Sequence, residues 1–168
     1  MKRENIVTRE QIRDVSAALR ADNKTVVFTN GSFDILHAGH VTYLAWAREQ
    51  GDALVVGLNS DNSVRRYKGD KRPIVPEVER ALVLASLESV DYVVVFDEDE
   101  PVDLIKAVRP DILVKGAQWA HYVAGREVVE EHGGRVELAP MVEGRSTTNI
   151  IERVLEVYGS DSDESAEK

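Results

Sequence analysis

The chain has 168 residues, of which 43% are hydrophobic and 30% charged, so it is long enough for one domain with a buried core. Its net charge of −9 argues against a nucleic-acid-binding protein that relies on a broadly basic surface. The absence of cysteine excludes disulfides and thiolate metal sites, and no apolar run approaches the roughly 18 residues that cross a bilayer.

Short apolar runs rich in β-branched residues alternate with helical patterns along the chain. A first helix is expected at residues 8–20, where Thr8 and Gln11 have the spacing of a capping box. Strands are expected at 25–29, 53–59, 92–96, 112–114 and 135–138, and helices at 40–50, 77–88, 102–108, 123–132 and 147–158. This alternation predicts an α/β fold, a single doubly wound parallel-sheet (Rossmann-like) domain.

The predicted domain spans residues 1–158, with residues 1–23 as an N-terminal helical extension. Residues 159–168 are acidic and contain no apolar side chain larger than alanine, so we expect a disordered tail rather than a functional acidic arm.

In a doubly wound sheet, ligands bind beyond the carboxyl ends of the strands, where the strand order reverses. The polar segments expected at these ends are residues 30–40, 59–72, 115–119 and 143–149. Three of the four contain a lysine or arginine beside glycine. The sequence therefore predicts that one edge of the sheet carries the chemistry.

The first of these segments ends in His-x-Gly-His. His37 and His40 are separated by Ala38 and Gly39 at the expected start of a helix, where backbone N–H groups favour anions. Gly39 leaves room for a phosphate to approach the backbone. We interpret the imidazoles as phosphate donors rather than as ordinary polar residues at a helix start. A metal site is disfavoured because no third ligand of suitable type lies nearby.

The second segment is strongly basic, with five cations in residues 65–73. Such a run is usually a solvated loop, and the functional interpretation is a mobile basic loop that closes over a triphosphate. Lys68 and Arg72 are the preferred contacts, although Arg65, Arg66 and Lys71 are not distinguished from them by sequence.

The last segment, Arg145 to Asn149, precedes an apolar helical pattern. Ser146 or Thr147 suits the N-cap of that helix, and the same hydroxyls and free N–H groups form an anion cradle. The motif is weak alone and becomes specific when it is paired with His-x-Gly-His about a hundred residues earlier.

Three further positions allow two interpretations each. Asp34 suits either a buried capping carboxylate or a ligand to an acceptor, and Asp61 suits either an acceptor ligand or a helix N-cap. Trp119, at the end of Lys115-Gly116-Ala-Gln-Trp119, suits either the core or a base platform. His121 and His132 are interpreted as surface histidines.

Five blocks together resemble the heptose 1-phosphate adenylyltransferases of the cytidylyltransferase-like nucleotidyltransferase superfamily, over residues 25–157. They are Thr-Asn-Gly-Ser-Phe-Asp-Ile-Leu-His-Ala-Gly-His, Asn-Ser-Asp-x-Ser-Val, Lys-Gly-Asp-x-Arg-Pro, Leu-Val-Lys-Gly and Arg-Ser-Thr-Thr-Asn-Ile-Ile. The family occurs free-standing or as half of a bifunctional heptose kinase/adenylyltransferase. Two positions depart from its pattern: Ser32 stands where cysteine is common, and Gln118 stands where aspartate is usual.

The resemblance implies three groups of site residues. Catalytic roles fall on His37, His40 and Lys68. Nucleotide contacts fall on Asn30, Gly31, Ser32, Phe33, Gly39, His40, Lys115, Gly116, Arg145, Ser146, Thr147 and Thr148. Substrate contacts fall on Asp34, Asn59, Asp61 and Arg72, and no metal site built from protein side chains is expected.

The resemblance also implies the reaction and its partners. ATP and a sugar 1-phosphate give an ADP-sugar and pyrophosphate, with Mg²⁺ carried by the nucleotide and no organic cofactor. We expect a cytoplasmic homo-oligomer, most often a dimer, with a separate sugar kinase supplying the acceptor. The alternatives are a cytidylyltransferase for glycerol phosphate or a related polyol phosphate, an adenylyltransferase for a cofactor precursor such as a flavin, and a regulatory nucleotide-binding module.

Overall fold

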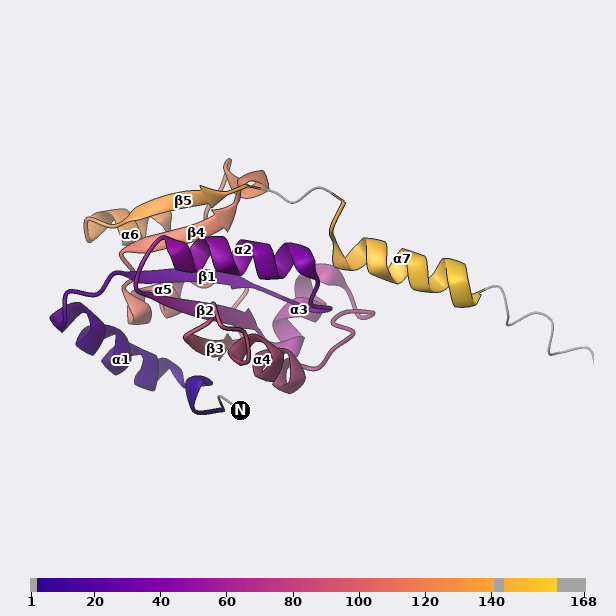
Figure 1. The fold of residues 1–168 in the computed structure, drawn as a ribbon, viewed down its shortest axis with the longest axis horizontal. Helices are drawn as coiled ribbons and strands as arrows, with labels where there is room; N and C mark the ends of the chain where they lie inside the picture. The colour runs from indigo at the N-terminus through magenta and orange to yellow at the C-terminus, as the bar shows by residue number, and fades with distance from the viewer. Residues whose placement is uncertain (1–2, 141–143, 160–168) are drawn as a thin grey trace, which may run out of the picture.

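The computed structural model describes residues 3–140 and 144–159 and contains one five-stranded sheet (Figure 1). All of its strand pairs are parallel, in the order β3-β2-β1-β4-β5. The strands are β1 (Val26–Gly31), β2 (Ala53–Asn59), β3 (Tyr92–Phe96), β4 (Ile112–Gly116) and β5 (Arg135–Ala139). The predicted Rossmann-like fold is confirmed, and β1 and β4 each run two residues further than expected.

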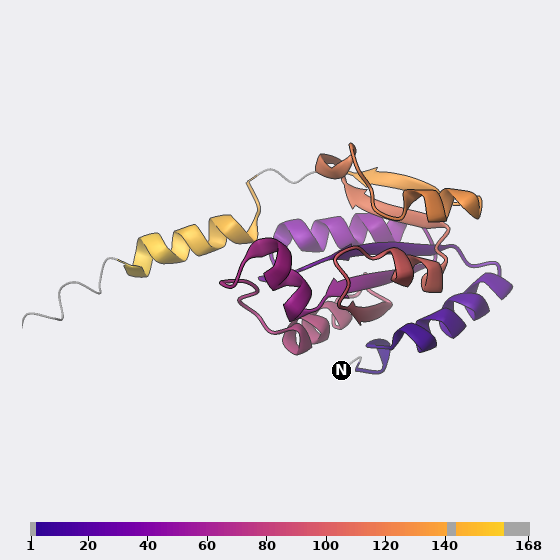
Figure 2. The same cartoon turned by 180° about the vertical axis from the view of Figure 1, so that it is seen from behind.

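Helices cover both faces of the sheet (Figures 1 and 2). The α2 and α4 helices pack on one face, and α1, α5 and α6 pack on the other. The α-helices are α1 (Arg9–Ala21), α2 (Ala38–Glu49), α3 (Asp61–Lys68), α4 (Glu77–Ala85), α5 (Val102–Val108), α6 (Arg126–Glu131) and α7 (Thr147–Tyr158), and the 3-10 turns are η1 (Arg3–Asn5) and η2 (Ala117–Trp119).

The strand sequences explain the two cores. Successive side chains of a strand point to opposite faces, so Val27 enters the core beneath α2 and α4 while Val26 and Phe28 enter the other. Every residue of β2 is buried, as expected of a central strand covered on both sides.

The helix α3 corrects the sequence interpretation, which placed a mobile basic loop in this region. Ser60 caps the helix by accepting a hydrogen bond from the Ser63 N–H at 3.0 Å. The last turn contains Arg65, Arg66 and Lys68, which interact favourably with the helix dipole. Lys68 therefore sits on a rigid element, and the irregular segment between α3 and α4 is confined to residues 69–76.

The strand order shows where on the sheet the predicted ligand-binding edge lies. From β1 the chain moves outward through β2 to β3, and then returns to add β4 and β5 on the other side. The reversal lies between β1 and β4, whose carboxyl ends carry Asn30 and Lys115. This is the position where doubly wound sheets bind ligands.

Gly57 in β2 provides a test of the packing beneath this edge. A Cβ at residue 57 would lie 2.8 Å from Cζ of Phe28 and 3.1 Å from Cδ2 of Leu104, both of which are buried. We expect Gly57→Ala to lower the free energy of unfolding by about 1–3 kcal/mol, because the core must open to admit one methyl group. Urea denaturation measures this loss.

Gly159→Ala is the matched control, because a Cβ there meets no described heavy atom within 4 Å. Its unfolding free energy should stay within about 0.5 kcal/mol of wild type. Equal stability of the two variants would contradict the tight packing of β2.

The last helix, α7, extends away from the body of the domain (Figures 1 and 2). Within the described parts of the chain, none of its residues is buried. None of the helices in residues 3–140 and 144–159 has the length and apolar character of a membrane span. Most of the predicted acidic tail, residues 160–168, lies outside the described residues.

Candidate active site

A pocket of about 870 Å³ opens at the predicted edge of the sheet. It is lined by residues from the ends of β1 and β4, from α2 and α3, and from the start of α7. Of the predicted site residues, all except Asp34 and Asp61 line it. Segments more than a hundred residues apart in the sequence therefore converge on one cavity.

The two histidines lie together at the amino end of α2. His37 is the N-cap residue, and the His37 and His40 rings stack with their centroids 3.9 Å apart. Gly39 permits this arrangement: a Cβ there would come within 3.0 Å of the His37 ring and 3.1 Å of the Arg145 Cβ. Glycine at this position thus lets the histidines and the start of the last helix approach one another.

The surroundings of both imidazoles favour the neutral form. Burial, followed by the proximity of His37 and Lys68, lowers the pKa of His40 to about 4. Burial and the nearby Arg145 also lower the pKa of His37. Both Nδ1 atoms are buried and have no hydrogen-bond partner among the described residues. A neutral imidazole still has one N–H to donate, so the pair suits an anionic ligand without carrying a charge of its own.

Lys115 supplies a cation at the strand-order reversal. Its Nζ donates to Oδ1 of Asn30 on the neighbouring strand at 2.8 Å. Burial lowers the pKa of Lys115 to about 8, and the recorded contact is with a neutral amide rather than a carboxylate. This arrangement favours a site that receives its counter-charge from a bound anion.

Lys68, the last residue of α3, and Arg72, in the segment that follows it, also line the pocket. Nζ of Lys68 donates to Oγ of Ser32 at 3.0 Å, and burial, followed by the proximity of Arg72, lowers the pKa of Lys68. Nε of Arg72 donates to Oδ2 of Asp34 at 2.6 Å. These two predicted cations are therefore held at fixed positions by groups of the β1–α2 segment.

The two predicted substrate carboxylates lie behind the lining. Asp34 is 3% exposed; its second oxygen accepts from the Ile74 and Val75 N–H groups at 2.8 and 2.9 Å. Burial raises the pKa of Asp34, but these hydrogen bonds and Arg72 outweigh it and lower the pKa overall. Asp61 forms a 2.6 Å ion pair with Arg80. Both carboxylates thus hold neighbouring protein groups.

The amino end of α7 completes the cavity. Oγ of Ser146 accepts from the Asn149 N–H at 3.1 Å, which confirms the expected N-cap. The Thr147 hydroxyl lies 3.4 Å from the Ile35 carbonyl oxygen and links α7 to the β1–α2 segment. Two helix amino ends, those of α2 and α7, therefore border one pocket, and each favours negative charge.

Sequence reasoning missed several residues of this region. Tyr43 lines the pocket, with its hydroxyl 2.6 Å from Oγ1 of Thr29; burial raises its pKa. Asp99 and Glu100 also line the pocket, and Glu100 accepts from the Tyr122 hydroxyl at 2.9 Å. Arg80 lies beneath the pocket and is described below. The sequence signal for Arg80 is a charged residue on the apolar stripe of a helix.

The position of Trp119 after β4 decides between the two interpretations given for it above. Trp119 is 51% exposed and lines the pocket, so it does not belong to the core. Gln118 also lines the pocket, and its side chain lies over Gly116. His121 and His132 are exposed, as predicted.

The chain was compared with known protein families and sequences. The cytidylyltransferase-like family profile matches residues 28–153. The chain is 60% identical to "Bifunctional protein HldE" of Syntrophotalea carbinolica over 151 residues, covering 89% of this chain and 31% of that protein. It is also 60% identical to the protein of the same name from Geobacter sulfurreducens over 148 residues, covering 88% and 30%. The chain thus spans about a third of the length of these relatives.

A solved structure is similar as well. It is described as the lipopolysaccharide core biosynthesis protein from Thermoplasma volcanium, with a TM-score of 0.58 and 28% sequence identity, covering 73% of this chain and 99% of that one. The matched profile covers most of the chain and includes both histidines and the start of the last helix. The chain therefore belongs to the cytidylyltransferase-like family.

Proposed function

We propose that this chain is a nucleotidyltransferase that joins ATP and a sugar 1-phosphate, D-glycero-D-manno-heptose 1-phosphate, to give ADP-heptose and pyrophosphate. The observation that carries the proposal is the convergence of two histidines whose pKa values are lowered, four cationic side chains and two helix amino ends on one pocket. This combination suits a triphosphate. The similarity to the HldE proteins supports heptose as the sugar.

The reaction needs no protein nucleophile. An oxygen of the acceptor phosphate attacks the α-phosphorus of ATP in line, the bond from that phosphorus to the bridging oxygen breaks, and pyrophosphate leaves with the electron pair. The protein contributes positioning and charge stabilisation, which together lower the barrier by several kcal/mol.

Each group around the pocket has a role in this scheme. His37 and His40 donate to α- and β-phosphate oxygens as negative charge moves toward the leaving group. The amino end of α7, with Ser146, Thr147 and Thr148, holds the β- and γ-phosphates next to Arg145. Lys115 and the remaining predicted nucleotide-binding residues border the nucleotide, listed in chain order as Asn30, Gly31, Ser32, Phe33, Gly39 and Gly116.

The acceptor lies on the side of Lys68 and Arg72 in this scheme. Lys68 neutralises charge between the triphosphate and the acceptor phosphate, and Arg72 with Asn59 faces the acceptor. Asp34 acts by holding Arg72 at 2.6 Å rather than by contacting substrate. Asp61 is likewise a positioning group.

Mg²⁺ fits this site as a companion of the nucleotide. Both oxygens of Asp34 and Oδ1 of Asp61 already accept protein hydrogen bonds. No group of three or more histidine or carboxylate side chains suitable for a metal ion occurs in residues 3–140 and 144–159. Mg²⁺ binds through phosphate oxygens and water and shields their charge. We also propose a cytoplasmic location, where ATP is available, and a separate kinase that supplies the sugar 1-phosphate.

Pyrophosphate release tests the proposal. ATP or CTP is combined with Mg²⁺ and either heptose 1-phosphate or glycerol 3-phosphate. We expect release with ATP and heptose 1-phosphate, at least about 100-fold faster than with the other pairs, because a site built for one base and one sugar leaves polar groups unpaired with the wrong partner. Preference for CTP and glycerol 3-phosphate would instead assign the chain to the polyol cytidylyltransferases.

We propose further that the enzyme is a homodimer. The helix α7 has apolar side chains that the domain leaves uncovered: Val154, Leu155 and Tyr158 are 50%, 63% and 71% exposed. A second copy that covers this face would also fix the start of α7 against the pocket.

Light scattering after size-exclusion chromatography measures the mass. We expect a dimer for the wild type and a monomer for Leu155→Glu, because a charge in an apolar interface is strongly unfavourable. Glu152→Gln, on an exposed position of the same helix, should remain dimeric. A monomeric wild type would contradict the dimer.

A further inference from the structure

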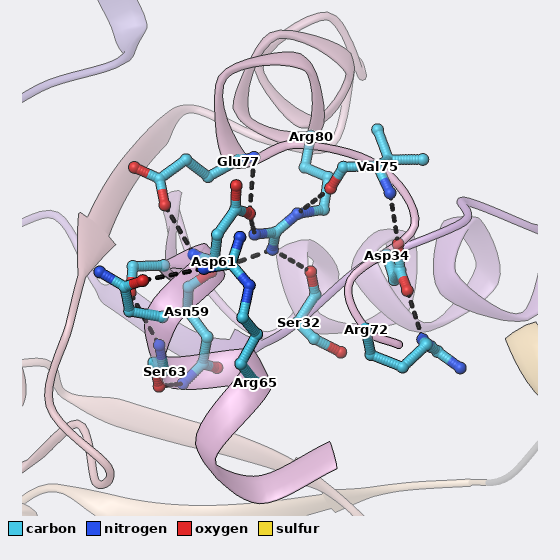
Figure 3. A network of polar contacts seen from close by, with 12 residues as sticks. Ser32, Asp34, Asn59, Asp61, Ser63, Arg65, Arg72, Val75, Glu77 and Arg80 are labelled. Atoms are coloured by element: carbon cyan, nitrogen blue, oxygen red, sulfur yellow. Dashed lines mark hydrogen bonds and ion pairs between the residues drawn. The ribbon is translucent and has the colours of Figure 1, made fainter. Parts of the chain in front are cut away.

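Arg80 is a fully buried cation beneath the pocket. It lies in α4, is 1% exposed, and directs its guanidinium toward the ends of β1 and β2 (Figure 3). Burying an arginine is unfavourable unless its donors are satisfied. Here all four recorded acceptors are backbone carbonyls or a carboxylate.

These acceptors belong to segments that form the acceptor side of the pocket. Arg80 donates to the carbonyl oxygen of Ser32 at 2.5 Å and to that of Asn59 at 2.9 Å. It donates to Oδ1 of Asp61 at 2.6 Å, and through Nε to the carbonyl oxygen of Val75 at 2.8 Å. One side chain thus joins the β1–α2 segment, the end of β2, the start of α3 and the segment before α4.

Two of these contacts lead to Lys68. The first runs through Ser32, whose backbone is held by Arg80 and whose hydroxyl accepts from Nζ of Lys68 at 3.0 Å. The second runs through Asp61, the first residue of α3, while Lys68 is the last residue of that helix. Arg80 therefore holds both the segment that the Lys68 side chain contacts and the start of the helix that carries Lys68.

Asp61 is also fixed by a reciprocal contact with the start of α4. Its N–H donates to Oε2 of Glu77 at 2.6 Å, and its Oδ1 accepts from the Glu77 N–H at 2.9 Å (Figure 3). The amino ends of α3 and α4 are thus joined, with the guanidinium between them. Lysine at position 80 would not reproduce this, because an ammonium group lacks the planar fork that reaches separate acceptors.

We propose that Arg80 is a positioning residue for nucleotidyl transfer, which acts by holding Ser32 and the start of α3 so that Lys68 is fixed against the phosphates. The inference rests on the proposed function in assigning Lys68 to the triphosphate and acceptor. It differs from a purely structural role because its effect on the reaction passes through Lys68.

A double-mutant cycle separates the two roles. Arg80→Met is made in the wild type and in a Lys68→Met background, and kcat is measured with ATP and heptose 1-phosphate. Arg80→Met alone should lower kcat by about 100-fold, the size of effect expected from a displacement of about 1 Å in the site. In the Lys68→Met background the same substitution should lower kcat by less than about threefold, because residues that act as a unit are not additive.

Leu84→Ala controls for lost stability. Leu84 is fully buried one turn after Arg80 on the same helix and does not line the pocket. The Leu84→Ala substitution should lower the free energy of unfolding measured in urea and keep kcat within about twofold of wild type. Asp61→Asn removes the charge of one Arg80 partner without changing the shape of the side chain, so it provides the cycle if Arg80→Met does not fold.

Binding of inorganic pyrophosphate, measured by calorimetry, makes the test independent of turnover. Introduced alone, Arg80→Met should weaken pyrophosphate binding about tenfold. Introduced into the Lys68→Met variant, it should weaken that binding less than twofold. If the wild type binds pyrophosphate but transfers no nucleotide to heptose 1-phosphate, the proposed function fails while the binding cycle still tests Arg80. Equal effects of Arg80→Met in both backgrounds would overturn the proposal.

Discussion

Replacing His40 by alanine is expected to lower kcat about 100- to 1,000-fold, the loss seen when one preorganised donor to a developing negative charge is removed. His40 is suited to this role by its surroundings. Its ring stacks on that of His37 and is packed edge to face with that of Phe33, with the two ring centroids 5.2 Å apart, so its orientation is fixed before substrate binds. Its pKa of about 4 leaves it neutral at pH 7.

The neutral state also predicts the pH dependence in acid. A neutral imidazole with an ordinary pKa would gain a proton between about pH 7 and 6, and a rate that depended on the neutral form would then fall. Because the neutral form of His40 persists down to about pH 4, its titration should not change kcat/KM between pH 7 and 5.5.

Steady-state pyrophosphate release measures the loss of kcat, and urea denaturation checks that the variant remains folded. His132→Ala, at an exposed histidine after α6, is the matched control and should retain wild-type turnover. A His40→Ala enzyme with kcat within threefold of wild type would show that the histidine pair does not stabilise the transition state.

The sequence was sufficient to predict the sheet and the edge that carries the pocket. All strands except β5 are built on short apolar runs, as in Val26-Val27-Phe28, and such runs between helices indicate a parallel sheet. Once the strands are placed, topology brings Asn30 and Lys115 together, although they are 85 residues apart. Local sequence patterns can therefore predict which distant residues lie close together, once they identify the fold class.

The directions of individual side chains were less predictable. Asp34 and Asp61 follow strands at the functional edge, which suggested substrate contacts, yet their oxygens accept from Arg72 and Arg80. Which neighbour a carboxylate meets depends on tertiary packing that no local pattern specifies. The helix α3 was considered only as an alternative, with Asp61 as its N-cap, because its single buried apolar residue, Val64, gives no periodic signal; the N-cap is instead Ser60.

Lys115→Met is expected to raise stability and lower activity at the same time. Burial lowers the pKa of Lys115 from 10.5 to about 8, which corresponds to roughly 3 kcal/mol of unfavourable interaction for the charged form. Methionine has a similar shape without the charge, but it loses the hydrogen bond to Asn30. We expect a net rise in unfolding free energy of about 1–3 kcal/mol at pH 7, together with an affinity for MgATP that is about 10- to 100-fold weaker.

The pH dependence of the free energy of unfolding distinguishes removal of a buried charge from improved packing as the cause of the higher stability. Between about pH 8 and 10.5, Lys115 is deprotonated in the folded protein and protonated in the unfolded chain. The unfolded state then binds more protons, so this residue makes wild-type stability rise with pH in that range. The stability advantage of Lys115→Met should therefore shrink between pH 7 and 9.5.

Urea denaturation at the two pH values and calorimetric titration with MgATP measure both effects. Lys106→Met removes an exposed lysine on α5 and should change neither stability nor ATP affinity appreciably. A Lys115→Met protein that is less stable than wild type at pH 7 would contradict the assignment of an unfavourable buried charge. The expected result, a more stable protein that binds ATP weakly, follows from keeping a desolvated cation ready for a triphosphate, since sites built for function are commonly not optimal for stability.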